Sequence, residues 1–429
     1  MSETRDELER EIGARRVGTL EVGARPMPLA LPASEDEVVA LLRLATRLRW
    51  RVLPVGSGSK VATGPAFEKA RFALSVRGLT GITAYERGDG TITARAGNPM
   101  SALAAVALSG GNHLTPDVAD APSATLGGTL ASGTSGIDRL RFGPVRNHVL
   151  GMRVALADGT LANTGGKLVK NVTGYDLHRL YTGSRGSLCV ILEASLRLFP
   201  APERVTVITE TYFGRNAALA AAAEVIASPV RPLAVCVENS TGDASRWTLY
   251  VALAGRTEPV EWERNAVVSI VGTSGATSGG HSLEGREARA SIELLRDLDI
   301  GATLRLSVLP AHLPPALAAH EELCNVHGVQ SRLAIHPGIA SVVTRLALPS
   351  GETLDAERLI ALARALQARG IQVTLLDAPL GARRGVDALA NASEAERALS
   401  ARLKKALDPN NIFVGARFDP VAVAEVPRH

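Results

Sequence analysis

The 429-residue chain is long enough for two or three domains at roughly 100–200 residues each. Its hydrophobic share of 46% and charged share of 21% are ordinary for a globular protein, and its net charge is only +4. Aromatic residues make up 3%, too few for the stacking platforms that bind single-stranded nucleic acid, so no nucleic-acid partner is expected.

The cysteines and the apolar runs limit the kinds of metal site and the cellular location that we expect for the chain. Cys189, Cys236 and Cys324 are far apart and form no C-x-x-C pair, which argues against an iron–sulfur or zinc site, and no metal is expected. The first residues are charged and lack the apolar core of a signal peptide, and no run approaches the ~18 apolar residues of a membrane helix. We therefore expect a cytoplasmic protein with no membrane span, reaching the inner face of a membrane only through partner subunits.

The pattern of residues 1–30 predicts a charged leader helix followed by an irregular, proline-containing segment. Ser34 can cap the next helix, because Glu37 stands three residues later and apolar positions follow at helical spacing. The buried stripe of that helix is expected to be Val38, Leu41, Leu42 and Ala45.

A short strand predicted at Val52 to Val55 runs directly into the loop Gly56-Ser57-Gly58-Ser59-Lys60. Small residues let a backbone curl so that successive N–H groups converge on a pyrophosphate, and Lys60 would add a positive charge. The loop is not a Rossmann fingerprint, because Val61 takes the place of the third glycine, nor is it a Walker A loop. Taken alone, it indicates either phosphate binding or an ordinary turn.

Strands are predicted at residues 72–76, 82–85 and 91–96, followed by a helix at 99–108. Residues 114–147 show little regular pattern and are dense in glycine and hydroxyl side chains. Long structureless loops are uncommon in compact domains unless they bind something, and these residue types suit a polar, flat ligand. A strand at 149–156 and a hairpin turn at 157–160 are expected next.

The stretch from Gly165 to Pro200 contains glycine turns, a short amphipathic helix at 177–181 and a strand at 187–198. The loop Gly183-Ser184-Arg185-Gly186-Ser187 stands at the mouth of that strand. Free N–H groups beside a basic residue suit a phosphate or an anionic ring edge, so the loop is predicted to offer its N–H groups to a ligand. The alternative is a tight structural turn.

Beyond Pro200 the chain mixes strands and helices, which predicts an α+β layer in which helices cover an antiparallel sheet. Arg383 and Arg384 lie in a glycine-flanked loop and are expected to be solvated. The expected strands are 204–213, 233–237, 246–253, 302–309, 333–348 (two strands or a bent one) and 371–376, and the expected helices are 217–226, 261–270, 283–298, 317–327 and 354–368.

Five motifs occur in order: VLPVGSGSK, LTPDVADAPSATLGG, RFGPVRN, LADGTLANTGGKLVKNVTGYDL and GSRGSLCVILEASLRLFP. The set resembles the FAD-binding domain of the vanillyl-alcohol-oxidase/p-cresol-methylhydroxylase (PCMH) type, and within that superfamily the E-type FAD-binding subunit of bacterial glycolate oxidases. The resemblance covers residues 30–200 and, less closely, the tail.

The resemblance implies an α+β fold with a PCMH-type FAD-binding domain of two α+β subdomains, followed by an α+β cap domain with an antiparallel sheet. The implied limits are a leader at 1–30, the FAD-binding domain at 31–200, the cap or substrate domain at 201–395, and a C-terminal segment at 396–429 that returns to the FAD domain.

The resemblance also implies, position by position, which residues hold FAD. The glycine–serine loop would bind the pyrophosphate, the hydroxyl-rich region would line the ribityl chain and ring, and residues 185–191 would close over the flavin, with Ile191 using its main chain. The implied cofactor-binding residues are Pro54, Val55, Gly56, Ser57, Gly58, Ser59, Lys60, Pro116, Asp117, Ser123, Thr125, Gly127, Gly128, Ser132, Gly133, Thr134, Ser135, Arg185, Gly186, Ser187 and Ile191.

Three positions depart from the family pattern. The family's glycine-rich loop ending in Thr is here Gly56 to Ser59, its Thr-Leu-Gly is Ser187-Leu188-Cys189, and its C-terminal Asn-Pro-Gly-Arg is Val414 to Arg417. Some members attach FAD to a histidine soon after the glycine loop, but no histidine precedes His113, so FAD is expected to be noncovalent.

Oxidation of a 2-hydroxy acid by a flavin needs a cation for the carboxylate and a base near the hydroxyl. Candidate catalytic residues in the implied cap are Arg305, Arg332, His336 and Arg345. The alternative is that an alternating Leu-Arg-Leu strand simply turns its arginine to solvent. The cap histidines match no metal-ligand motif.

Two functions remain open. The chain is either the FAD-binding subunit of an oxidoreductase that passes a hydride from glycolate, D-lactate or a similar 2-hydroxy acid to flavin N5, or an accessory flavoprotein that holds FAD for electron relay or assembly while a sister subunit oxidises the substrate. The resemblance implies a sister FAD subunit and an iron–sulfur subunit as partners in both cases.

Overall fold

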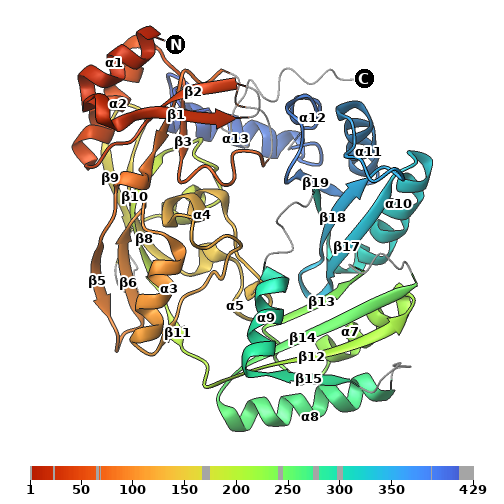
Figure 1. Ribbon diagram of the computed structural model, residues 1–429. Coiled ribbons are helices and arrows are strands. Elements are labelled where there is room, and N and C mark those ends of the chain that lie inside the picture. Colours follow the sequence, from red (N-terminus) through yellow and green to blue (C-terminus); the bar gives the residue numbers. More distant parts are fainter. Residues whose placement is uncertain are drawn as a thin grey trace. The chain divides into compact units, whose positions relative to one another are not determined.

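The computed structural model describes residues 2–22, 25–63, 67, 69–166, 174–239, 245–273, 280–296, 303–387 and 389–414 (Figure 1). Its backbone contacts divide the chain into two compact units. The first unit comprises residues 1–135, 144–200 and 383–429, and the second comprises residues 136–143 and 201–382. The second unit is therefore largely an insertion between two parts of the first.

The first unit contains a four-stranded and a five-stranded sheet. The four-stranded sheet has the order β1-β2-β4-β3, with β1 and β2 antiparallel and the other neighbours parallel. The five-stranded sheet has the order β5-β6-β10-β8-β9 and is antiparallel throughout. The strands are β1 Val17–Val22, β2 Arg25–Ala30, β3 Val52–Val55, β4 Phe72–Ser75, β5 Ile82–Glu86, β6 Thr91–Arg95, β8 Val149–Ala155, β9 Leu161–Gly165 and β10 Val190–Arg197, with the short pair β7 Asn112–His113 and β11 Phe199–Pro200.

The helices of the first unit are α1 Ser2–Ile12, α2 Glu35–Leu48, α3 Met100–Ser109, α4 Leu126–Ser132, α6 Leu177–Tyr181 and α13 Glu394–Leu407. The predicted start of α2 is confirmed, because the Ser34 side chain accepts a hydrogen bond from the Glu37 N–H at 3.2 Å. The predicted stripe of α2 is buried as well.

The irregular leader expected before α2 is wrong. Residues 17–22 and 25–30 form the antiparallel strand pair β1–β2, and Leu8 and Ile12 of α1 belong to the hydrophobic core of the first unit. Pro26 and Pro28 suggested a non-strand segment, but they stand at alternate positions of β2, so their missing N–H groups belong to one edge of that strand. β4 pairs only with Leu29 and Ala30, beyond both prolines, so the sheet tolerates them.

Residues 114–147 are also more regular than expected, since they contain α4 and α5 Arg139–Phe142. Thr125 caps α4 by accepting a hydrogen bond from the Gly128 N–H at 3.2 Å. Gly127 is required for packing, because an added Cβ would stand 2.8 Å from the Cβ of Ala96. Helix α4 contains two glycines, and glycine favours loops over helix interiors, so the sequence pattern does not predict this helix.

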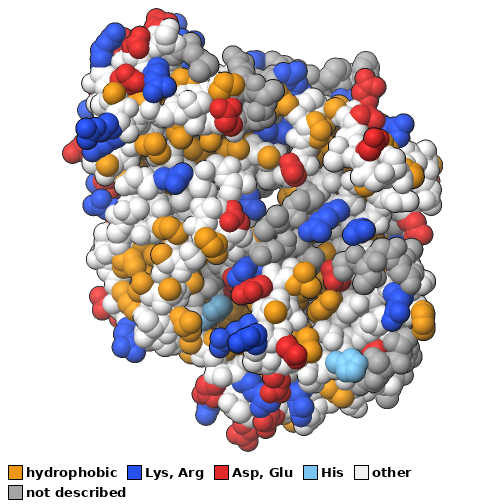
Figure 2. All heavy atoms as spheres, viewed as in Figure 1, with side chains coloured by type: hydrophobic (Ala, Val, Ile, Leu, Met, Phe, Trp, Pro, Cys, Tyr) orange, Lys and Arg blue, Asp and Glu red, His pale blue; other side chains and the backbone are white. Residues whose placement is uncertain are grey.

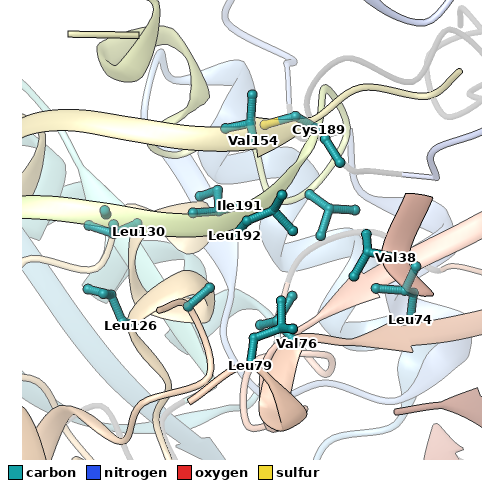
Figure 3. Packing of buried hydrophobic residues seen from close by; sticks show 14 of the residues in the cluster. Val38, Leu74, Val76, Leu79, Leu126, Leu130, Val154, Cys189, Ile191 and Leu192 are labelled. Carbon is teal, nitrogen blue, oxygen red and sulfur yellow. The ribbon is translucent and has the colours of Figure 1, made fainter. Parts of the chain in front are cut away.

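One continuous apolar core joins the two sheets of the first unit. Figure 3 shows side chains of β4 and the turn after it, such as Leu74 and Val76, packed toward Leu126 and Leu130 of α4 and Leu192 of β10. Helix α4 is thereby held between the sheets, and its first turn lies next to the end of β3.

The second unit is built on an eight-stranded antiparallel sheet with the order β15-β12-β14-β13-β17-β18-β16-β19, which confirms the expected α+β layer (Figure 1). The helices α7, α10 and α11 contact this sheet. The elements are β12 Arg204–Phe213, α7 Arg215–Ala227, β13 Ala234–Glu238, β14 Arg246–Gly255, α8 Thr257–Thr273, β15 His281–Glu284, α9 Gly285–Arg296, β16 Leu304–Ser307, α10 Leu313–Val326, β17 Gln330–His336, β18 Ser341–Ala347, α11 Ala356–Ala368 and β19 Gln372–Leu375.

Two local predictions need correction. The helix expected from residue 283 begins at Gly285 and is preceded by strand β15. Arg383, expected to be solvated, is 4% exposed on α12 Leu380–Gly385, whereas Arg384 is exposed. The Arg383 guanidinium donates to the Val61 carbonyl at 2.6 Å and lies over the Phe67 ring at 5.4 Å, which compensates it for lost water.

The surface seen in Figure 2 carries basic and acidic side chains interspersed with one another, as the small net charge leads one to expect. Over the described residues, no helix combines the length and the apolar character needed to cross a bilayer.

We expect Leu8→Ala to lower the free energy of unfolding of the first unit by about 2–5 kcal/mol, because Leu8 is fully buried and its removal leaves a cavity. Glu11→Ala, at an exposed position of the same helix, should change it by less than about 0.5 kcal/mol. Urea unfolding followed by circular dichroism measures both. Equal unfolding midpoints would mean that α1 is a detachable leader.

Candidate functional site

The glycine–serine loop follows β3 and lies against the first turn of α4. A Cβ added at Gly56 would overlap the Thr125 hydroxyl and come within 3.2 Å of the Gly128 Cα. The Ser75 hydroxyl donates to the Gly56 carbonyl at 2.7 Å, and Gly58 has a φ of +92°, which side chains rarely allow. Only glycine fits position 56 at this distance from α4.

Three successive N–H groups of this loop have no acceptor among the described residues, whereas the Ser59 N–H donates to the Ser57 hydroxyl at 3.4 Å. Gly56, Ser57 and Gly58 donate no backbone hydrogen bond to any described residue, although all three are half-buried. Most buried backbone N–H groups in proteins are paired. Three successive unpaired donors are therefore suited to an anionic acceptor from outside the chain.

The predicted residues of the α4 region form a second group. The hydroxyls of Ser132 and Thr134 are hydrogen-bonded to each other at 2.8 Å, and both are half-buried. The Ser135 hydroxyl is buried and accepts the Val145 N–H at 3.1 Å, so it holds the loop before β8. Gly133 has a φ of +71°, and an added Cβ would stand 3.1 Å from the Gly183 Cα.

The loop at residues 183–187 differs from its prediction. The N–H groups of Gly183, Ser184, Arg185 and Ser187 donate to the carbonyls of Leu130, Tyr181, Ala131 and Ser184, at 2.7–3.1 Å. These four groups are therefore unavailable to a ligand, and the prediction that the loop offers them is wrong. The loop is a tight turn fastened to the end of α4.

The same loop nevertheless meets the glycine–serine loop. A Cβ added at Gly186, whose φ is +73°, would stand 3.0 Å from the Cβ of Pro54. The Arg185 guanidinium donates to the Thr63 carbonyl at 3.1 Å. Residues 54–63, 125–135 and 183–187 thus lie together in the first unit, although more than 120 positions separate Arg185 from Thr63.

The other predicted cofactor residues differ in their exposure. Pro116 is buried and Asp117 half-buried in the segment before α4, while Ile191 is buried in β10. Ser123 is exposed, and its hydroxyl donates to the Asp120 carboxylate in the same turn. Ser59 is exposed and Lys60 half-buried.

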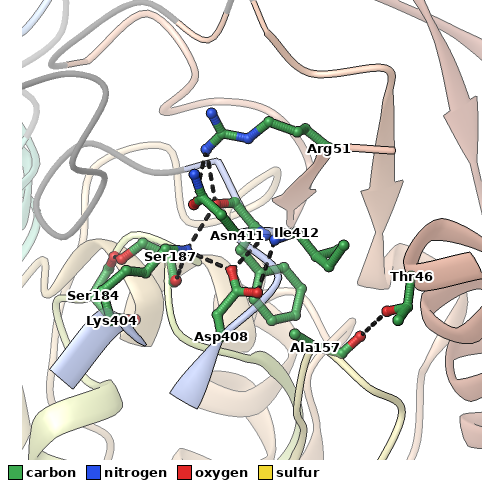
Figure 4. Close-up of polar contacts among 10 residues, drawn as sticks. Thr46, Arg51, Ala157, Ser184, Ser187, Lys404, Asp408, Asn411 and Ile412 are labelled. Carbon is green, nitrogen blue, oxygen red and sulfur yellow. Dashed lines mark hydrogen bonds and ion pairs between the residues drawn. The ribbon is translucent and has the colours of Figure 1, made fainter. Parts of the chain in front are cut away.

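Sequence reasoning missed Lys404 of α13, which contacts the 183–187 loop. Its ammonium is buried and donates to the Ser187 carbonyl at 2.8 Å, the Phe413 carbonyl at 2.8 Å and the Asp408 carboxylate at 2.6 Å (Figure 4). Phe413 also forms an isolated parallel bridge with Val52 of β3. The i,i+4 spacing of Lys404 and Asp408 is the available signal, but such pairs are usually exposed. Gly415 to Arg417 lie outside the described residues.

The four candidate catalytic residues of the second unit lie on one face of its sheet. Arg332 of β17 is directly opposite Arg345 of β18. Arg305 is opposite Val343, and His336 is opposite Ser341, at alternate positions of β18. Directly opposite residues in antiparallel strands project from the same face, and so do residues two apart. Arg332 and Arg345 are exposed, whereas Arg305 and His336 are half-buried.

A buried carboxylate side chain lies on the same face of the sheet. Glu238 of β13 is opposite Ala334, between Arg332 and His336 on β17, and is buried. Burial raises the pKa of the Tyr250 hydroxyl well above its usual value, and the Glu238 carboxylate raises it further by its charge and hydrogen bond. Tyr250 is therefore a neutral hydrogen-bonding group at physiological pH. Over the described residues, no group of three or more His, Cys, Asp or Glu side chains could hold a metal ion.

Comparisons with known proteins agree with this geometry. Residues 26–165 match a family model described as FAD binding domain. The glycolate oxidase subunit GlcD of Bacillus subtilis is 30% identical over 207 residues, which span 48% of this chain and 44% of the relative. The D-2-hydroxyglutarate dehydrogenase of Xanthomonas citri pv. viticola is 34% identical over 177 residues, spanning 41% of this chain and 38% of the relative. The matched regions thus span less than half the length of these relatives.

A solved structure supports the fold over a much larger part of the chain. The structure of p-cresol methylhydroxylase with substrate bound matches 97% of this chain and 96% of its own, with a TM-score of 0.76 and 15% identity.

We expect Gly56→Ala to weaken FAD binding by at least about 10-fold, because the new methyl group forces the loop away from Thr125 and moves its free N–H groups. Gly88→Ala is the matched control, since an added Cβ there meets nothing within 4 Å. Titration of apoprotein with FAD, followed by flavin fluorescence, measures both. Unchanged affinity in Gly56→Ala would exclude this loop from the binding site.

The sequence motifs resemble the E-type FAD-binding subunit of glycolate oxidases, whereas the Bacillus subtilis relative is the subunit GlcD of such an enzyme. The fold and the cofactor domain do not depend on that distinction. Residues 26–165 match the FAD binding domain model, and the chain has the α+β fold of p-cresol methylhydroxylase.

Proposed function

We propose that this chain is the FAD-binding subunit of a glycolate oxidase-like 2-hydroxy-acid oxidoreductase. The observation that carries the proposal is the FAD binding domain match, taken with relatives named for oxidation of glycolate and D-2-hydroxyglutarate. These relatives share a substrate class, a 2-hydroxy carboxylate. FAD supplies the two-electron acceptor for such a substrate when it is bound.

The N–H groups of Gly56, Ser57 and Gly58, which donate to no described residue, would bind the pyrophosphate of FAD, with Lys60 adding positive charge. The hydroxyls of the α4 region, Thr125, Ser132 and Thr134, would bind the ribityl chain and ring edge. We propose noncovalent attachment, because no histidine stands between the glycine–serine loop and His113. On this proposal the first unit forms the cofactor domain and the second unit the cap, and the change from cap to cofactor domain falls at residue 382 rather than at the expected residue 395.

The one-sided arrangement of Arg305, Arg332 and Arg345 supports a carboxylate-binding role for the sheet of the second unit. A guanidinium matches the two oxygens of a carboxylate in a bidentate pair. His336, on the same face, would accept the proton of the substrate hydroxyl. Arg305 is the strongest candidate of the three arginines, because it is half-buried and charge-assisted hydrogen bonds gain strength away from water.

One observation favours the second candidate function, an accessory FAD subunit beside a catalytic sister subunit. Glu238 is buried on the same sheet face as the candidate arginines, and a buried carboxylate opposes the approach of a second one. In either case we propose a cytoplasmic complex in which a sister FAD subunit and an iron–sulfur subunit take part.

The purified chain is expected to be yellow and to lose its absorbance near 450 nm when glycolate, D-lactate or D-2-hydroxyglutarate is added without oxygen. An anaerobic visible spectrum before and after each addition measures this, with dithionite as the control for reducible flavin. A yellow chain that dithionite bleaches and no 2-hydroxy acid bleaches would favour the accessory function.

For a substrate that reduces the flavin, we expect Arg305→Met to raise KM by about 10- to 100-fold with a smaller change in kcat, as for loss of a hydrogen bond to a charged group. Arg358→Met is the control, because Arg358 forms an exposed ion pair with Asp355 on α11. Steady-state rates with an artificial electron acceptor, measured over a range of substrate concentrations, give both constants. Equal KM values in both variants would remove Arg305 from the substrate site.

A further inference from the structure

We propose that Arg383 and Lys404 are positioning residues for the FAD site. Each donates a hydrogen bond to a backbone carbonyl in or next to one of the two loops that flank the cofactor. They would set FAD affinity without contacting FAD. The inference rests on the proposed FAD site, and it assigns a role to the part of the first unit that contains Arg383 and Lys404.

Arg383 holds the far end of the glycine–serine loop. Its guanidinium donates to the Val61 carbonyl at 2.6 Å, one residue after Lys60, and lies over the Phe67 ring at 5.4 Å. The residue is 4% exposed, so this hydrogen bond forms away from water and is correspondingly strong. A second arginine, Arg185, donates to the Thr63 carbonyl two residues further on.

The two arginines therefore bind carbonyl groups at one end of the loop, while the unpaired N–H groups of Gly56 to Gly58 stand at its other end. Holding the carbonyls restricts the directions in which the N–H groups can point. An anion site of backbone donors depends on that orientation, because each donor must converge on the same group.

Lys404 does the same for the 183–187 loop. Its ammonium donates to the Ser187 carbonyl at 2.8 Å and is held in turn by Asp408 and the Phe413 carbonyl (Figure 4). The Asp408 carboxylate also accepts the N–H groups of Ile412 and Phe413, both at 2.8 Å. This buried pair is satisfied on all sides, and its removal leaves the Ser187 carbonyl without its cation.

The proposal predicts different effects for the two residues, which a general loss of stability would not produce. Arg383 acts on the loop assigned to the pyrophosphate, so its loss should weaken ADP and FAD alike. Lys404 acts on the 183–187 loop, which the family resemblance places beside the flavin, so its loss should weaken FAD and change the flavin spectrum while leaving ADP binding within about 2-fold. The chain offers matched controls in Arg384 and Lys405, the exposed neighbours of the two residues.

The test uses the full chain with Arg383→Met, Lys404→Met, Arg384→Met and Lys405→Met. FAD affinity is measured by flavin fluorescence, ADP affinity by calorimetry, and the stability of each apoprotein by thermal unfolding. We expect Arg383→Met to weaken both ligands by about 10-fold or more, Lys404→Met to weaken FAD alone by a similar factor, and both controls to match the parent chain.

Affinities equal to those of the controls, or losses of FAD and ADP affinity that only follow the loss of apoprotein stability, would overturn the proposal. Should a Met variant fail to fold, Arg383→Lys and Lys404→Arg decide the question, since each keeps its charge and alters only its reach. A parent chain that binds FAD but is not reduced by 2-hydroxy acids contradicts the proposed oxidation alone. A parent chain that binds no FAD contradicts the cofactor assignment itself.

Discussion

The close approach of Gly56 to the start of α4 is the constraint on which the rest of the first unit depends. A backbone can come this near to Thr125 and Gly128 only where no Cβ intervenes. The contact joins the end of a parallel strand to a helix that the apolar core holds between two sheets. It leaves the donors at residues 56–58 without acceptors in the described chain, and this combination of rigidity and unpaired polarity suits a site for a phosphate group.

Charged side chains in the first unit also hold backbone groups in place. Arg185, Arg383 and Lys404 each donate a hydrogen bond from a charged group to a main-chain carbonyl. A buried cation is costly unless hydrogen bonds compensate it, and the carbonyls supply those bonds. The polar groups that the ligand would meet are then mostly neutral N–H and hydroxyl groups.

Much of the fold could be predicted from the sequence where local chemistry and tertiary packing agree. The Ser34 cap, the buried stripe of α2, strand β3 and the turn between β8 and β9 all follow from short-range patterns. The resemblance of the five ordered motifs to PCMH-type domains led to the architecture, which the solved structure supports.

The errors arise where distant partners override local preference. Strand β2 carries two prolines because β4 pairs only beyond them. Helix α4 carries two glycines because Ala96, directly after β6, lies close to Gly127, and Thr125 and Gly56 lie close to Gly128. Arg383 is buried because its guanidinium contacts the Val61 carbonyl and the Phe67 ring, over 300 positions earlier in the chain. The N–H groups of Gly183 and Arg185 in the 183–187 loop donate to the end of α4, a contact that no local signal reveals. The roles of the individual site residues stay predictions.

The bridge between Val52 and Phe413 has a consequence for how the protein is made. The strand that leads into the glycine–serine loop receives its last neighbour from a segment synthesised some 360 residues later, after the whole second unit. Closing so long a loop costs entropy before any contact repays it, and such contacts slow folding. On the ribosome the strand before the glycine–serine loop therefore lacks this neighbour until the second unit has been synthesised.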